Sequence, residues 1–177
     1  MIIYKDIITD DEIISDTYKL VADGPVLWTA DCRKYLKGAE NIQLEGANPS
    51  AEEGEEDGGE GEKVMVHDIE DQFRLVWLKD EDGLKPSKDG FKSHLKSYVK
   101  AINNKLKEKG ASEETIKEFQ GGAAAAVKKI LANYDNYDVL MNQSMDANGM
   151  HVLIDFREDG VTPYATVWKH GLVEMKV

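Results

Sequence analysis

The stretch FKSHLKSYVKAINNKLKEKGASEETIKEFQGGAAAAVKKILANY, residues 91–134, decides the fold class. Apolar residues in its first half recur at spacings of four, three, four and four, which is the stripe of an amphipathic helix. The stripe consists of Phe91, Leu95, Tyr98, Ile102 and Leu106. Gly110 ends this helix, and Ser112 is a good N-cap for a second one. The pattern therefore predicts an antiparallel helical hairpin over about residues 87–135.

The second helix is expected to bury one apolar face. We assign to this face Ile116, Phe119, Ala123, Val127, either Ile130 or Leu131, and Tyr134. Gly121 and Gly122 lie in the middle of the helix. Each glycine costs about 1 kcal/mol relative to alanine in a helix interior. We therefore expect a close helix crossing or a kink at this pair.

Short strands are predicted on both sides of the hairpin. MIIYKDII, KLVADG and VLWTAD precede it, each bounded by Asp, Gly or Pro, and MHVLIDF, PYATVWK and LVEMKV follow it. Residues 64–77, VMVHDIEDQFRLVW, show an apolar period of two and are also predicted to be extended. The order of elements favours an α+β fold in a single domain over residues 1–177.

An acidic segment interrupts this domain. Residues 46–62, GANPSAEEGEEDGGEGE, hold five glycines and only two weakly apolar residues, so a disordered loop is predicted. Residues 45–62 carry −8 of the formal net charge of −12. Ser50 has acids two and three positions later and is a candidate phosphorylation site. The alternative for Ser50 is an unmodified polar loop residue.

The first helix of the hairpin carries the opposite charge. Residues 85–109 hold eight lysines against two acids. Four of the lysines are spaced by four and form what we call the lysine ridge: Lys88, Lys92, Lys96 and Lys100. The ridge is either a solvated helix face or a docking surface for an acidic partner segment, for which the acidic loop would compete.

Composition excludes several classes of protein. The net negative charge argues against nucleic acids and anionic membranes as partners. A single cysteine, Cys32, allows neither an internal disulfide nor a CxxC metal site and indicates a reducing compartment, the cytoplasm. The opening residues lack the apolar core of a signal peptide, and no stretch reaches the about 18 apolar residues of a membrane span.

Catalytic and metal-binding motifs are also missing. The four histidines (His67, His94, His151 and His170) do not form an HExxH pattern, and there is no phosphate-binding glycine motif. Residues 80–83 and 155–160 lack the ligand pattern of an EF-hand. We therefore expect a protein that is not an enzyme and has no tightly bound cofactor. Calcium could be attracted weakly by the acidic loop, and no metal ligands are assigned.

The sequence resembles the translationally controlled tumour protein family over its whole length. The opening MIIYKDI, the segment GANPSAEE, the helix end ILANYDNY and the closing LIDFREDGVTPYATVWKHGLVEMKV carry the resemblance. One departure is clear. The second signature of the family usually has a Gly-Glu pair where this chain has Asn142 and Gln143.

The resemblance implies a β-tent of twisted, mainly antiparallel sheets from which the hairpin and the acidic loop project. This tent is shared with zinc-binding Rab-interacting proteins and with methionine sulfoxide reductases of the B type. Those relatives use paired cysteines, so Cys32 alone could reproduce neither their metal site nor their redox couple.

The resemblance also implies function. Members of the family are multifunctional cytoplasmic interaction proteins in growth regulation, and nucleotide exchange on the small GTPase Rheb is one proposed role. The acid implied in this role is Glu12, whose plain alternative is a turn acid between two strands. The other implied roles are stress response and survival, through tubulin, calcium and apoptosis regulators. The tubulin and calcium roles fall on or near the hairpin. A monomer is expected.

Overall fold

The computed structural model describes residues 1–37 and 64–176. The acidic segment 46–62 and the candidate phosphorylation site Ser50 lie outside the described residues, so their predictions stay predictions. The same holds for the contact that we considered between the acidic loop and the lysine ridge.

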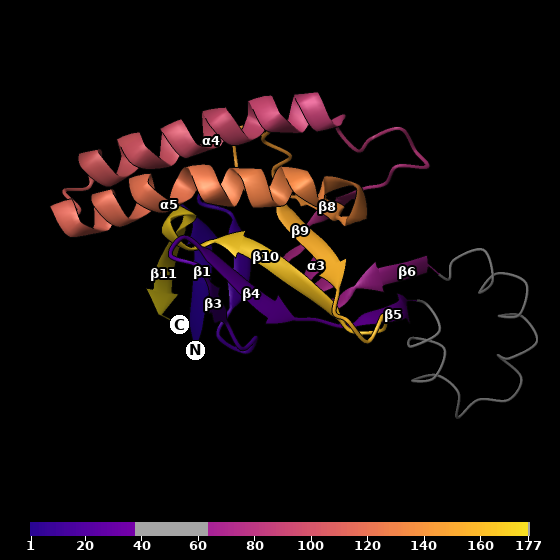
Figure 1. The fold of residues 1–177 in the computed structure, drawn as a ribbon. Coiled ribbons are helices and arrows are strands. Elements are labelled where there is room, and N and C mark those ends of the chain that lie inside the picture. The colour runs from indigo at the N-terminus through magenta and orange to yellow at the C-terminus, as the bar shows by residue number, and fades with distance from the viewer. Residues whose placement is uncertain (38–63, 177) are drawn as a thin grey trace, which may run out of the picture.

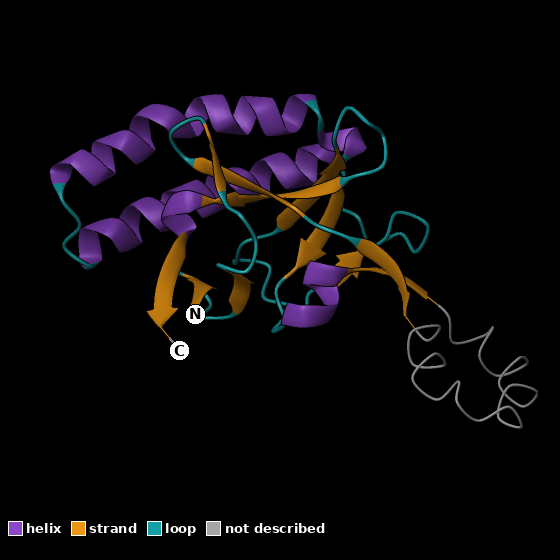
Figure 2. Cartoon of the chain, turned by 90° about the horizontal axis from the view of Figure 1, so that it is seen from below, coloured by secondary structure: helices purple, strands orange, loops and turns teal. Residues whose placement is uncertain are grey.

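Two long helices form one layer of the molecule and the strands form the other (Figures 1 and 2). The helices are α4 (Lys88–Glu108) and α5 (Glu113–Ala132), and they are antiparallel neighbours as predicted. Ser87 caps α4, because its hydroxyl oxygen accepts a hydrogen bond from the Gly90 N–H at 3.1 Å. All five residues of the predicted stripe on α4 are buried. At about 1.5–3 kcal/mol for each large apolar side chain, this face holds the helix on the core.

The buried face of α5 differs from our prediction. It consists of Phe119, Gly122, Ala123, Ala126 and Ile130, whereas Ile116, Val127 and Leu131 are only partly buried. A Cβ atom on Gly122 would lie 2.6 Å from Cγ of Pro25, so the helix touches the loop before β4 at this point. The close contact is therefore with that loop and not with α4. The helix continues through the glycine pair without a break.

Antiparallel strands make up the second layer. Within the described residues, one sheet has the order β11-β1-β2 and a larger one the order β3-β4-β10-β9-β8-β7, while β5 pairs with β6. The bounds are β1 (Ile2–Asp6), β2 (Glu12–Ser15), β3 (Val21–Asp23), β4 (Leu27–Asp31), β5 (Lys34–Lys37), β6 (Val64–His67), β7 (Val76–Leu78), β8 (Asp138–Met141), β9 (Val152–Phe156), β10 (Pro163–Trp168) and β11 (Leu172–Lys176). Short helical turns, η1 (Tyr134–Asn136) and η2 (Lys169–Gly171), precede β8 and β11. Pairing of β1 with β11 brings the two ends of the chain together (Figure 1).

Residues 64–77 are not continuously extended as we predicted. A short helix, α3 (Asp68–Phe73), separates β6 from β7. Its buried residues Ile69 and Phe73 are four apart, a helical spacing. The Glu70 carboxylate also accepts a hydrogen bond from the His67 N–H at 3.1 Å, which closes a capping box. These local signals outweigh the alternation on which the prediction rested.

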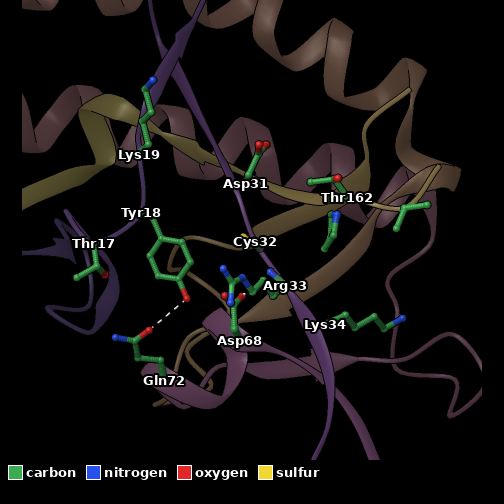
Figure 3. A pocket seen from close by; sticks show the side chains of 12 residues that line it. Thr17, Tyr18, Lys19, Asp31, Cys32, Arg33, Lys34, Asp68, Gln72 and Thr162 are labelled. Carbon is green, nitrogen blue, oxygen red and sulfur yellow. Dashed lines mark hydrogen bonds between the residues drawn. The ribbon is translucent and has the colours of Figure 1, made fainter. Parts of the chain in front are cut away.

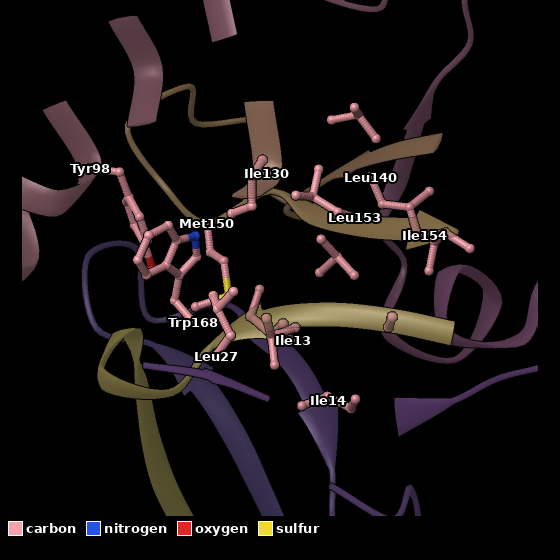
Figure 4. Packing of buried hydrophobic residues seen from close by; sticks show 14 of the residues in the cluster. Ile13, Ile14, Leu27, Tyr98, Ile130, Leu140, Met150, Leu153, Ile154 and Trp168 are labelled. Carbon is pink, nitrogen blue, oxygen red and sulfur yellow. The ribbon is translucent and has the colours of Figure 1, made fainter. Parts of the chain in front are cut away.

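Trp168 joins the two layers of the core. It lies at the end of β10. Its ring makes T-shaped contacts with Tyr98 of α4 and Phe119 of α5, with ring centroids 6.4 and 6.3 Å apart. Ile130 of α5 and Leu27 of β4 belong to the same cluster of buried residues (Figure 4). The result is an α+β fold in which the hairpin covers the strands, consistent with the predicted β-tent. None of the described helices is long and apolar enough to cross a membrane.

Candidate functional site

Glu12 is the first residue of β2, and its side chain is exposed. It is not a turn acid between two strands, because the register pairs it with Lys5 of β1. The three residues that follow it, Ile13, Ile14 and Ser15, have no exposed surface. The carboxylate of Glu12 is therefore presented from a strand that is fixed in the core.

Glu12 lines a hollow of about 400 Å³ that we call the Glu12 hollow. The other residues of its lining are Lys5, Asp10, Asp11, Gln72, Phe73, Arg74 and Gln143. Arg74 follows α3 in the left-handed conformation, with φ of 57°, and its N–H donates to the Glu70 carbonyl. Three separate parts of the chain, around β2, α3 and β8, thus build one polar surface.

Two charged side chains of this hollow, those of Glu12 and Arg74, are available to a partner, whereas other charged groups of the lining already have partners. Lys5 pairs with Asp10 at 3.6 Å, and Asp11 accepts a hydrogen bond from the Ser144 N–H at 3.4 Å. Within residues 1–37 and 64–176, no hydrogen bond or ion pair holds the side chain of Glu12 or Arg74. These two side chains can therefore form new ion pairs without breaking old ones.

The departure from the family signature has two different consequences. Asn142 is fully buried, and its amide accepts from the Asp146 N–H and donates to the Asp146 carbonyl, both at 2.8 Å. This side chain therefore builds the turn after β8. Gln143 is exposed and lies in the Glu12 hollow. An uncharged amide here takes the place where the family usually has a carboxylate, beside Glu12.

The lysine ridge forms a separate surface. Lys88, Lys92, Lys96 and Lys100 are all exposed on α4. No ion pair engages any of them among the described residues. The structure does not bring the ridge into the Glu12 hollow, since the two surfaces share no lining residue. An acidic segment could approach the ridge with little competition from the neighbouring side chains.

Cys32 borders a polar hollow of about 800 Å³, together with Tyr18, Arg33 and Asp68 (Figure 3). Its thiol is buried and donates to the Ala30 carbonyl at 3.4 Å. Burial, with the nearby charge of Asp68, raises the pKa of Cys32 to about 12. The thiolate that a nucleophile or a redox couple requires is therefore strongly disfavoured in the folded protein.

A histidine pair was not predicted from the sequence. His94 of α4 and His151 before β9 are in ring contact, with centroids 4.1 Å apart. Burial lowers the pKa of His94, and burial with the charge of His94 lowers the pKa of His151 to about 4. Only the position of His94, three residues after Phe91 and four before Tyr98, hinted that it faces inward. Within the part of the chain that is described, no group of three or more His, Cys, Asp or Glu residues could hold a metal ion.

Comparison with known proteins gives the family. The family model described as "Translationally controlled tumour protein" matches residues 1–173. The chain belongs to the translationally controlled tumour protein family. It is similar to the translationally-controlled tumor protein homologs of Aspergillus fumigatus, at 72% identity, and Emericella nidulans, at 68%, with all of each chain covered.

Solved structures of the same family confirm the fold. The translationally controlled tumor-associated protein p23fyp of Schizosaccharomyces pombe is 38% identical, with a TM-score of 0.76 and full coverage of both chains. The family member from Caenorhabditis elegans is 27% identical, with a TM-score of 0.70, and 100% of this chain and 99% of that chain are covered. These relatives carry the name of the family and not the name of an enzyme.

Proposed function

We propose that this member of the translationally controlled tumour protein family is a non-enzymatic interaction protein of the cytoplasm, active in growth regulation. Its specific role in this proposal is to promote nucleotide exchange on a small GTPase of the Rheb class. The observation that supports it is the exposed Glu12 carboxylate, which has no partner among the described residues and stands on a strand fixed in the core.

The chemistry of exchange suits such a carboxylate. A GTPase holds its nucleotide through a phosphate-binding lysine and a magnesium ion. A carboxylate that approaches this lysine, or displaces the magnesium ion, weakens the hold on the phosphates. Arg74 in the same hollow could pair with an acid of the GTPase and orient the complex.

Release of a fluorescent guanine nucleotide from a Rheb-type GTPase tests this proposal. The wild-type chain should accelerate release, and Glu12→Gln should abolish the acceleration because the amide has the same shape but no charge. Asp16→Asn is the matched control, since Asp16 is an exposed acid just after the same strand and does not line the hollow. Equal acceleration by the wild type and Glu12→Gln would exclude Glu12, and no acceleration by the wild type would exclude the exchange role.

We propose tubulin as a second partner, on the lysine ridge. The specific support is the row of exposed lysines without ion pairs, because the tails of tubulin are acidic. Stress response and survival through apoptosis regulators belong to this second proposal. Calcium would be bound weakly, by solvated carboxylates and not by a preformed cage.

Co-sedimentation with microtubules at low and moderate salt tests the second role. The pair Lys92→Glu with Lys96→Glu should release the chain from microtubules, and moderate salt should weaken binding of the wild type. Lys19→Glu with Lys176→Glu makes the same change in net charge at exposed positions away from α4. If both pairs weaken binding equally, net charge and not the ridge controls the interaction.

A further inference from the structure

A groove runs between the two helices of the hairpin. It has a volume of about 480 Å³, and we call it the hairpin groove. Its lining consists of Lys96, Val99, Lys100, Asn103, Phe119, Gln120, Ala123, Ala124 and Val127. Phe119 and Ala123 are buried and lie deepest, Val99 and Val127 are partly exposed, and Ala124 is exposed. The groove therefore offers a mainly apolar surface that the hairpin itself leaves uncovered.

The charged residues that line this groove, among those described, are all basic. Lys96 and Lys100 stand on its α4 side, and among the described residues that line it none is acidic. Lys117 and Lys128 lie on the α5 stripe of Gln120 and Ala124, at spacings of three and four, so they continue that side at either end. In a chain with a net charge of −12, the only charged side chains that line this apolar surface, among the residues described, are therefore those of lysines.

The two amide side chains of the groove, those of Gln120 and Asn103, are already hydrogen-bonded to each other. The Gln120 Nε2 donates to the Asn103 Oδ1 at 2.9 Å, which links the two helices. An extended peptide would leave its own backbone N–H and C=O groups without partners against the apolar wall, which is costly. A helix satisfies its backbone internally and can pack its side-chain ridges along two parallel helices.

We infer that the hairpin groove docks an amphipathic helix of a partner protein, with apolar residues at i, i+3 or i+4, and i+7 and with Asp or Glu on the flank that faces α4. The apolar residues would fill the groove, and the acids would meet Lys96 and Lys100. The inference rests in part on the proposed role of the lysine ridge, whose lysines it shares, and adds an apolar requirement that a disordered acidic tail does not meet.

A second copy of the chain fits this groove less well. In a two-fold symmetric dimer the same patch occurs on both subunits, so both sides of the interface would carry Lys96 and Lys100 and neither lining would carry an acid. Like charges at close range oppose such pairing. The charge pattern therefore favours a different protein that supplies acids.

A synthetic helical peptide of about four turns provides the probe. It carries leucines at a and d positions, glutamates along one flank and alanines elsewhere, and a control peptide has the same composition in scrambled order. Binding to the full chain is measured by fluorescence anisotropy. The patterned peptide should bind at least about tenfold more tightly than the scrambled one, because only its leucines form a stripe. Equal affinity for the two peptides would overturn the inference and reduce the effect to charge.

Two alanines of α5 give a matched pair of variants. Ala124 lines the groove, whereas its exposed neighbour Ala125 does not. Ala124→Glu should weaken binding of the patterned peptide about tenfold or more, because a carboxylate would enter an apolar contact and repel the acids of the peptide. Ala125→Glu should leave the affinity within about twofold of wild type, and far-UV circular dichroism of both variants checks the fold. Equal losses in the two variants would overturn the inference.

A charge swap provides a readout that does not depend on Ala124. The double variant Lys96→Glu with Lys100→Glu should no longer bind the glutamate peptide. It should instead bind a peptide in which every glutamate is replaced by lysine. Microtubule co-sedimentation of Ala124→Glu should equal that of the wild type. If the wild-type chain fails to bind tubulin but still binds the patterned peptide, the proposed tubulin role of the lysine ridge is wrong and the inference about the hairpin groove stands. Another outcome is that the wild type binds no peptide but self-associates or binds anionic vesicles, and that Ala124→Glu abolishes this binding. This result would assign the groove to another occupant and overturn the inference.

Discussion

Protonation of His151 should destabilise the fold on the acidic side of neutrality. The ring is buried and in contact with His94, and both effects favour its neutral form, whereas the hydrogen bond between Nδ1 and the Gly149 carbonyl at 3.2 Å favours the protonated form and offsets part of the shift. The pKa of His151 is lowered from 6.5 to about 4, first by burial and then by the charge of His94. Between about pH 4 and pH 6.5, His151 therefore binds a proton in the unfolded chain but stays neutral in the folded chain.

The sign and size of the effect follow from this difference. Stability from this group is complete above pH 6.5 and is lost as the pH falls toward 4, where the folded form also takes up the proton. At 1.36 kcal/mol for each pKa unit, the whole shift corresponds to a ceiling of about 3 kcal/mol. Asp6 works in the opposite direction, because burial raises the pKa of its carboxyl group and protonation then favours the folded state.

Comparison with His151→Gln isolates the contribution of this residue. The free energy of unfolding in urea should be measured at several pH values between 4 and 7 for both proteins. The wild type should lose up to about 3 kcal/mol more than the variant across this window. Carboxylates elsewhere in the chain titrate in both proteins and cancel in the difference. Parallel pH profiles for the wild type and His151→Gln would refute the reasoning, as would a His151 pKa near 6.5 in an NMR titration.

Three further expectations concern packing and reactivity. Gly122→Ala should destabilise the protein by about 1–3 kcal/mol in urea unfolding because its Cβ would lie 2.6 Å from Pro25, whereas Gly121→Ala, with nothing within 4 Å, should stabilise it by about 0.5–1 kcal/mol; the opposite order would contradict the packing described. Ile102→Ala should cost about 2–5 kcal/mol in the same assay, since this α4 side chain has no exposed surface, and a loss below 1 kcal/mol would show that α4 is not held by its stripe. Cys32 should react with a thiol reagent only after urea unfolding, and rapid labelling of the native protein would show that the thiol is accessible.

Local periodicity accounts for the elements that the sequence predicted well. The prediction of buried residues on α4 is confirmed at every position, because residues three and four apart lie on one face of a regular helix. The buried face of α5 was less predictable, because small residues such as Gly122 and Ala126 are buried by a close contact and not by hydrophobicity. Helix α3 was missed because its signals span only six residues, within a longer alternating pattern.

The candidate sites depend more on tertiary structure. Glu12 came from family resemblance, and the structure adds that it shares a hollow with Gln143, a residue 131 positions later. The lysine ridge was visible as a spacing of four, but the groove beside it requires the second helix. The pair His94 and His151 joins α4 to the residue before β9, and no spacing in the sequence encodes that contact.

Asp6 ties the two proposed surfaces to one frame. Its buried carboxylate accepts hydrogen bonds from the Met150 N–H at 2.7 Å, the Tyr98 hydroxyl at 3.1 Å and the Ile8 N–H at 3.0 Å. These bonds fix β1, the segment before β9 and α4 relative to one another. The Glu12 hollow and the hairpin groove are consequently held in place together while their linings differ, with three acids and two bases in the first and only lysines as charged groups in the second. Two partners can thus dock on one frame without competing for the same side chains, one on a surface of mixed charge and one on a basic surface, although the net charge of the chain is −12.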